Sequence, residues 1–169
     1  LICVAAARGE IDDIARAYWD AGIRHIVALR GDPPREAGGK YTAHPEGYPN
    51  AAALVAGLKR IGDFQISVAG YPERHPDSPD DKADLDNLRR KVDAGADRCI
   101  TQFFFDVDDF LRFRDRATAM GVQVPIVPGI MPVSNFAGIA RMAGMCGAKV
   151  PPCLAALFDG LDDDVETRR

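Results

Sequence analysis

An arginine and an aspartate stand directly after an apolar run, in the sequence HIVALRGD of residues 25–32. If the run is a strand, Arg30 and Asp32 lie at its carboxyl end, and Gly31 between them lets the backbone bend. The two charges would then face a ligand bound at the end of the strand. Spacing alone gives this interpretation no advantage over a second one, in which both residues are solvated in a loop.

Two more polar side chains have types suited to chemistry. His75, in the loop sequence PERHP, titrates near neutral pH and could bond to a ligand or carry a proton. No histidine or cysteine lies at ligand spacing from it, which argues against a metal site. Gln102 interrupts an otherwise apolar run, and a buried primary amide is costly unless its hydrogen bonds are satisfied. Gln102 is therefore the most conspicuous polar candidate.

A polar stripe accompanies the apolar stripe of one predicted helix, in the sequence ADLDNLRRKV of residues 83–92. At helical spacing Asp84, Asn87 and Lys91 share one side of the helix, next to the leucines. A carboxylate, an amide and a cation in line would suit a ribose or a pyrophosphate. On spacing alone a solvated face with ion pairs is the preferred interpretation.

The elements that must position these residues alternate along the chain. Apolar β-branched runs predict five strands: Ile2–Ala6, His25–Leu29, Phe64–Ala69, Arg98–Phe105 and Val124–Pro128. Amphipathic stretches predict five helices: Asp12–Ala21, Ala51–Ile61, Asp80–Ala94, Asp106–Met120 and Ser134–Cys146. Asp106 and Ser134 are predicted N-caps. The charged final residues could begin another helix.

This alternation predicts an α/β fold with parallel strands, either an open doubly wound sheet or a closed (β/α)₈ barrel. We favour the TIM-type barrel, because polar residues follow every strand and a barrel gathers all of these ends on one active face. Only about five βα units are visible, and a full barrel takes ~250 residues. Residues 1–169 are therefore expected to form one partial barrel domain of a longer protein.

Composition limits the classes of partner. The formal net charge of −4 argues against a surface that binds nucleic acid. No apolar run approaches the ~20 residues that span a bilayer. The 4 cysteines form no disulfide or zinc pattern, which favours reduced thiols in a cytoplasmic protein. No Gly-rich phosphate-binding motif of the Rossmann or P-loop type occurs.

Five segments, in this order, closely resemble the bacterial methylenetetrahydrofolate reductase family: RHIVALRGDPP, FQISVAGYPERHP, ADLDNLRRKVDAGADRCITQFFFDVDDFLRFRDR, PIVPGIMPVSNF and LFDGLDDDVETR. The resemblance covers essentially the whole chain. It implies an FAD-containing (β/α)₈ barrel that reduces 5,10-methylenetetrahydrofolate to 5-methyltetrahydrofolate with NAD(P)H, in a ping-pong hydride transfer. Folate and nicotinamide are the implied partners, and the full-length protein is expected to be a homo-oligomer.

The resemblance also implies roles for individual residues. Asp32 and Gln102 match the family's catalytic and folate-binding positions, and Asp32 lies near the flavin pyrimidine edge in that family. The matched cofactor-binding positions are Leu29, Arg30, Gly31, Asp32, Tyr71, His75, Asp84, Asn87, Arg90 and Lys91. The family's proton donor is a glutamate that would lie upstream of Leu1.

The chain departs from the family pattern at three positions. Asn50 aligns near a tyrosine at the flavin, Gly138 replaces a substrate-contacting glutamine, and Met142 replaces a phenylalanine that packs on the ligand. Two rival interpretations remain open from the residues. One is a flavin-free lyase or isomerase with Asp32 and His75 as acid and base, and the other is an inactive fragment.

Overall fold

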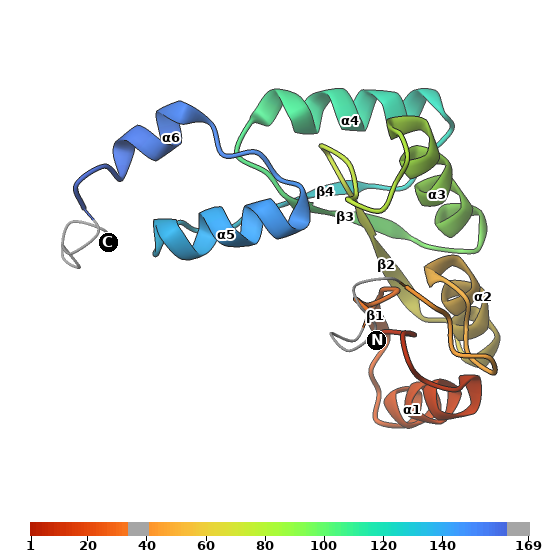
Figure 1. Ribbon diagram of the computed structural model, residues 1–169. Helices are drawn as coiled ribbons and strands as arrows, with labels where there is room; N and C mark the ends of the chain where they lie inside the picture. Colours follow the sequence, from red (N-terminus) through yellow and green to blue (C-terminus); the bar gives the residue numbers. More distant parts are fainter. Residues whose placement is uncertain (34–40, 162–169) are drawn as a thin grey trace.

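In the computed structural model, which describes residues 1–33 and 41–161, the chain forms a four-stranded sheet of parallel strands (Figure 1). The strands are neighbours in the sheet in the order in which they follow along the chain. They are β1 (His25–Ala28), β2 (Gln65–Gly70), β3 (Arg98–Phe103) and β4 (Ile126–Gly129). All four carboxyl ends therefore lie at one edge of the sheet, as expected for βα units.

A helix precedes or follows each of these strands. The helices are α1 (Arg8–Asp20), α2 (Ala51–Ile61), α3 (Asp81–Asp93), α4 (Val107–Ala119), α5 (Phe136–Cys146) and α6 (Pro152–Leu157). Helices α1 to α4 form an arc along one side of the sheet, and each packs against the next one (Figure 1). Helices α5 and α6 extend away from the β4 end (Figure 1).

The two faces of the sheet differ in burial, because successive side chains of a strand point to opposite faces. Ile26, Ile66 and Cys99 are buried in the core beneath the helices. Val27 and Val127, on the opposite face, are 43% and 38% exposed. In a closed barrel this second face points inward. The arrangement of the described residues is that of part of a (β/α)₈ barrel, and the Cys99 thiol is buried in its core.

The predicted first strand, Ile2–Ala6, is wrong. Ile2 alone in this range forms a β-bridge, a parallel one to Leu29, although Cys3 and Val4 also donate to backbone carbonyls of residues 29 and 30. Ala5 has a positive φ of 56°, which breaks the extended backbone after two residues. The segment nonetheless holds the end of β1, because the backbone N–H of Val4 donates to the carbonyl oxygen of Arg30 at 2.8 Å.

Most other boundaries shift by one or two residues, and the largest shift is at the start of the first helix. The first helix begins at Arg8 rather than Asp12, since the Glu10 carboxylate accepts a hydrogen bond from the backbone N–H of Ala7, the residue before the helix, at 2.9 Å. Strand β3 ends at Phe103 rather than Phe105. The range Ala51–Ile61 of α2 is confirmed. Helix α6 was not predicted, and the charged residues after Leu161 lie outside the described part of the chain.

Local side chains decide where α4 and α5 begin. Asp106 is the N-cap of α4, as predicted, and accepts from the N–H of Asp108 at 2.9 Å. The predicted cap Ser134 is wrong, because Asn135 takes that position and accepts from the N–H of Gly138 at 3.0 Å. None of the described helices is both long and apolar enough to cross a membrane.

Candidate active site

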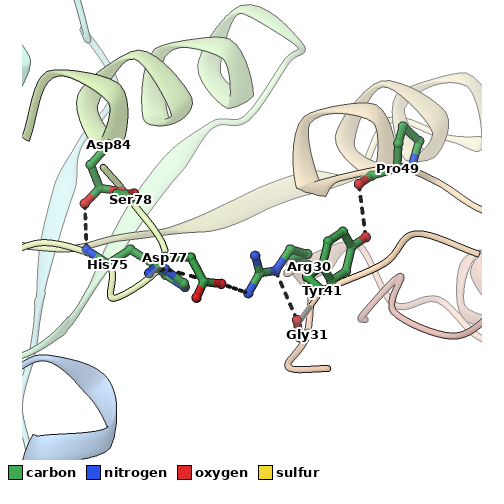
Figure 2. A network of polar contacts seen from close by, with 8 residues as sticks. All are labelled: Arg30, Gly31, Tyr41, Pro49, His75, Asp77, Ser78 and Asp84. Atoms are coloured by element: carbon green, nitrogen blue, oxygen red, sulfur yellow. Dashed lines mark hydrogen bonds and ion pairs between the residues drawn. The ribbon is translucent and has the colours of Figure 1, made fainter. Parts of the chain in front are cut away.

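Arg30 lies at the carboxyl end of β1 and is held on several sides (Figure 2). Its Nε donates to the Gly31 carbonyl at 3.2 Å, and its Nη2 donates to Asp77 at 2.9 Å. Its guanidinium carbon lies 4.5 Å from the centre of the Tyr41 ring. Gly31 is needed here, because its φ is +85° and a Cβ would lie 2.5 Å from Val4. The arginine side chain therefore has a defined orientation.

The loop between β2 and α3 is fastened to α3 by Asp84 (Figure 2). Asp84 accepts from the backbone N–H of His75 and from the hydroxyl of Ser78, each at 3.0 Å. The ring of His75 packs edge-on against Tyr71, with centroids 4.6 Å apart. Through Asp77, the same loop reaches Arg30. Two neighbouring βα units are thus joined at their strand ends.

The state of His75 follows from this packing. Burial lowers the pKa of His75 below its usual value, and the positive charge of Arg30 lowers it further. Its Nδ1 accepts from the backbone N–H of Asp77 at 3.0 Å, which requires the unprotonated nitrogen. His75 is therefore a neutral structural partner of this loop with Nδ1 already occupied.

Lys91 was predicted to lie on a polar stripe whose preferred interpretation was a solvated face, and that interpretation is wrong for this residue. Its side chain is only 5% exposed, and Nζ donates to the carbonyl oxygen of Ala69 near the end of β2. Burial lowers the pKa of Lys91, while the neighbouring Cys99 and Asp84 oppose that shift. Burial in turn raises the pKa of Cys99 to about 11. The ammonium group of Lys91 on α3 is therefore buried against the end of β2 instead of facing solvent.

A second group gathers beside this network. Tyr71, Gln102 and Cys146 lie close together between β2, β3 and the end of α5, around a small concavity that has no room for a water molecule. Burial raises the pKa of Tyr71 to about 12, with further contributions from Asp84 and Asp32. Burial also raises the pKa of Cys146, and the negative charge of Asp32 adds to it. Asp32 is exposed and follows β1, at the same edge of the sheet.

Gln102 is half-buried in β3, and its amide oxygen accepts from the backbone N–H of Phe103 at 3.0 Å. Among the described residues its amide nitrogen has no hydrogen-bond partner. The amide that interrupts the apolar run therefore retains N–H donors that no described residue uses. A ligand that offers an acceptor, such as a carbonyl or a ring nitrogen, would satisfy them.

Some predicted site residues contribute less to the arrangement. Leu29 is half-buried and pairs with the amino-terminal segment, and Asn87 is half-buried on α3. Arg90 is exposed on the far side of that helix from the core. Asn50 uses its amide oxygen to cap α2, at 3.0 Å from the N–H of Ala53. The structure thus gives Asn50 a capping role. Gly138 and Met142 lie on α5, both exposed.

Sequence reasoning missed four residues that the structure brings to the site: Tyr41, Asp77, Ser78 and Cys146. Asp77 and Ser78 stand directly after His75-Pro76, so a turn rich in polar side chains was a usable signal. Tyr41 and Cys146 carry no such signal, because their positions depend on contacts between distant segments.

A larger cavity of about 390 Å³ lies outside this site, between the β2–α3 loop and α4. Its charges are already paired, since Asp109 accepts from Arg112 at 2.6 Å and lies 3.7 Å from Lys149. The Glu73 carboxylate accepts from the backbone N–H of Lys149 at 2.8 Å. The cavity is therefore a region of ion pairs that joins the α5 end to α4. No three His, Cys, Asp or Glu residues in residues 1–33 and 41–161 could hold a metal ion.

Comparison with known sequences gives matches over the full chain. The profile of the family described as "Methylenetetrahydrofolate reductase" matches residues 1–169. The chain is 56% identical to a 5,10-methylenetetrahydrofolate reductase of Pectobacterium carotovorum, and 55% identical to one of Escherichia coli, over 169 residues in each case. These matches cover 100% of this chain but only 54% and 55% of the two relatives. The chain thus spans about half the length of these relatives.

A solved structure shares the fold at low identity. It is described as an uncharacterized protein from Clostridium thermocellum that binds two copies of 5-methyl-5,6,7,8-tetrahydrofolic acid. The TM-score is 0.62 at 16% identity, and the match covers 99% of this chain and 54% of that one. The likeness confirms the α/β fold class that the alternation of strands and helices predicts.

Proposed function

Because this chain belongs to the methylenetetrahydrofolate reductase family, we propose that the full-length protein reduces 5,10-methylenetetrahydrofolate to 5-methyltetrahydrofolate, with FAD as cofactor and NAD(P)H as electron donor. One observation carries the proposal beyond the family match. Tyr71 and Gln102 lie together at the carboxyl ends of β2 and β3, beside the network of Arg30 and His75, and Asp32 follows β1 at the same edge of the sheet. A cytoplasmic location is part of the same proposal.

The donor set fits a dinucleotide cofactor. Arg30 uses Nε and Nη2 in bonds, and its Nη1 has no partner among the described residues. Lys91 has three N–H donors, and one of them is bonded to Ala69. Guanidinium and ammonium groups are the usual partners of phosphate oxygens. Asp84 and Asn87, on the same side of α3, suit ribose or ribityl hydroxyls. These four residues would hold FAD, together with the other matched positions.

When bound, FAD supplies the hydride chemistry, accepting from the nicotinamide and donating to the folate. Asp32 places a negative charge at the strand end, and a nearby carboxylate opposes further negative charge there. Asp32 would thereby oppose a build-up of negative charge on the bound cofactor and favour transfer of a hydride from it. It also offers a carboxylate acceptor to the N–H groups of a pterin.

Gln102 positions the substrate. Its oxygen is held by Phe103, so the amide N–H groups are oriented for an acceptor on the folate or on the nicotinamide. Two substrates that use one amide in turn suit a ping-pong order. The proton that opens the folate ring is proposed to come from the glutamate that the family places upstream of Leu1.

The flavin-free alternative with Asp32 and His75 as acid and base is not favoured. The family match covers every residue of the chain. His75 also has Nδ1 engaged with Asp77, which leaves one ring nitrogen for chemistry.

The test is a purification of the full-length protein. We expect a yellow protein whose flavin absorbance bleaches with NADH under anaerobic conditions and returns when 5,10-methylenetetrahydrofolate is added. A colourless protein that does not bind added FAD would refute the proposal. Bleaching by NADH without reoxidation by the folate would refute the folate half alone.

A further inference from the structure

We propose that Asp77 is a positioning residue, which orients the guanidinium of Arg30 so that its free edge faces the cofactor. This inference rests on the proposed function, because it takes Arg30 as a ligand of FAD. Figure 2 shows the contact that carries it, an ion pair between loops that are 47 residues apart in sequence.

The first step is the fixed orientation of Arg30. Its side chain is bonded to Gly31 through Nε and to Asp77 through Nη2, and its flat face lies over Tyr41. The hydrogen bond to Gly31 joins neighbouring residues, and the contact with the Tyr41 ring still lets the guanidinium rotate within its own plane. Within residues 1–33 and 41–161, Asp77 is the residue that ties the outer end of the guanidinium to another βα unit. With it in place, Nη1 is the edge left for an anion among the described residues.

The second step is that Asp77 is itself held in place. Its backbone N–H donates to Nδ1 of His75, and the next N–H, of Ser78, donates to the carbonyl oxygen of His75 at 2.9 Å. Asp84 fixes both ends of this turn from α3. Pro76 restricts the backbone between them. The Asp77 carboxylate is therefore presented by a rigid turn, as a positioning group needs to be.

The ion pair between Arg30 and Asp77 contributes little to the stability of the fold. The side chains of Arg30 and Asp77 are 25% and 53% exposed. Ion pairs this open to water contribute little to folding, because solvent and salt screen them. An arginine left free of its partner regains most of its rotamer freedom, and a ligand must then restrict it again. Loss of Asp77 should thus weaken the binding of an anionic cofactor and leave unfolding unchanged.

A competing effect has the opposite sign. The negative charge of Asp77 repels a phosphate, so removing the charge alone would strengthen binding. Asp77→Asn isolates that effect, because the amide keeps an oxygen that can accept from Arg30. Asp77→Ala removes both the charge and the acceptor. Asp77→Ser stays polar but is too short to reach Arg30, and provides a second variant if the alanine one folds poorly.

The experiment measures FAD dissociation constants by quenching of flavin fluorescence on the full-length apoprotein. For Asp77→Ala and Asp77→Ser we expect about a fivefold weaker FAD affinity, with urea midpoints equal to that of the unmutated protein. Asp77→Asn should stay within about twofold. Asp86→Ala is the matched control, since Asp86 forms an ion pair with the exposed Lys82 within α3. It should bind FAD as the unmutated protein does.

A double-mutant cycle decides whether Asp77 acts through Arg30. In an Arg30→Ala background, Asp77→Ala should cause no further loss of affinity. An equal loss in both backgrounds would overturn the inference, as would FAD binding in Asp77→Ala and Asp77→Ser as tight as in the unmutated protein. If the unmutated protein binds no FAD, the proposed function fails instead, and the two failures are thereby distinct.

Discussion

Replacing Lys91 with methionine tests whether a buried cation serves the fold or the ligand. The lysine is 5% exposed and is bonded to the carbonyl oxygen of Ala69. A hydrogen bond from a charged donor contributes about 1.5–3 kcal/mol, but burying an ammonium costs several kcal/mol. Methionine has a similar length and no charge, although it leaves the carbonyl short of a donor, at a cost of about 1–3 kcal/mol. We therefore expect Lys91→Met to have a free energy of unfolding between unchanged and about 2 kcal/mol higher.

The same change should damage cofactor binding. If Lys91 supplies its remaining N–H donors to a phosphate, their loss weakens FAD binding by about 10- to 150-fold. Urea unfolding gives the stability, and flavin fluorescence gives the affinity. Lys82→Met, on the exposed face of α3, is the control and should change neither.

Two results would refute this reasoning. If Lys91→Met lost more than about 2 kcal/mol of stability and kept its FAD affinity, Lys91 would hold the fold and not the cofactor. The second would be a stability that stays flat as pH rises toward 10.5. Burial lowers the folded-state pKa of Lys91 below its ordinary value of 10.5, so at a pH between the folded pKa and 10.5 the unfolded chain binds more protons. Stability should then rise with pH across that window in the unmutated protein, and the methionine variant should lose the rise.

Three further outcomes are expected. In Gly129→Ala the new Cβ would lie 2.1 Å from the backbone oxygen of Thr101, which cannot move aside. Urea unfolding should therefore show a loss of about 1–3 kcal/mol in the free energy of unfolding. Gly144→Ala is the control and should show no loss, because nothing lies within 4 Å of its new Cβ. Burial opposes ionisation of Asp97, but hydrogen bonds from a lysine and a backbone N–H lower its pKa below 3.8. The stability that Asp97 contributes is therefore present above about pH 3.8 and is lost as pH falls through the folded pKa. In Asp97→Asn the melting temperature should depend less on pH in that range. Asp32→Asn should slow folate reduction more than NADH oxidation by a quinone acceptor, and an equal loss in both half-reactions would contradict the role proposed for Asp32.

The site shows how far local patterns reach. Arg30, His75 and Asp84 were predicted from residue type and family resemblance, and they do lie in one network. Their roles toward FAD stay predictions. Asp77 completes the network. Its place in a turn rich in polar side chains was a usable signal, but its pairing with Arg30 was not, because the two residues are 47 apart and an ion pair between loops leaves no period in the sequence. Cys146 was missed for the same reason.

The sequence by itself determined the order and type of most elements, from α1 to α5, since hydrophobic period, helix propensity and caps such as Asp106 act over a few residues. It also determined the family, through motifs that cover the whole chain. Tertiary structure decided what those elements do to single side chains. Asn135 displaces Ser134 as a cap, Ala5 ends an apolar run that looked like a strand, and Lys91 turns from a polar stripe into the interior. Each outcome depends on which distant surface meets the residue, and that surface exists only once the sheet has formed.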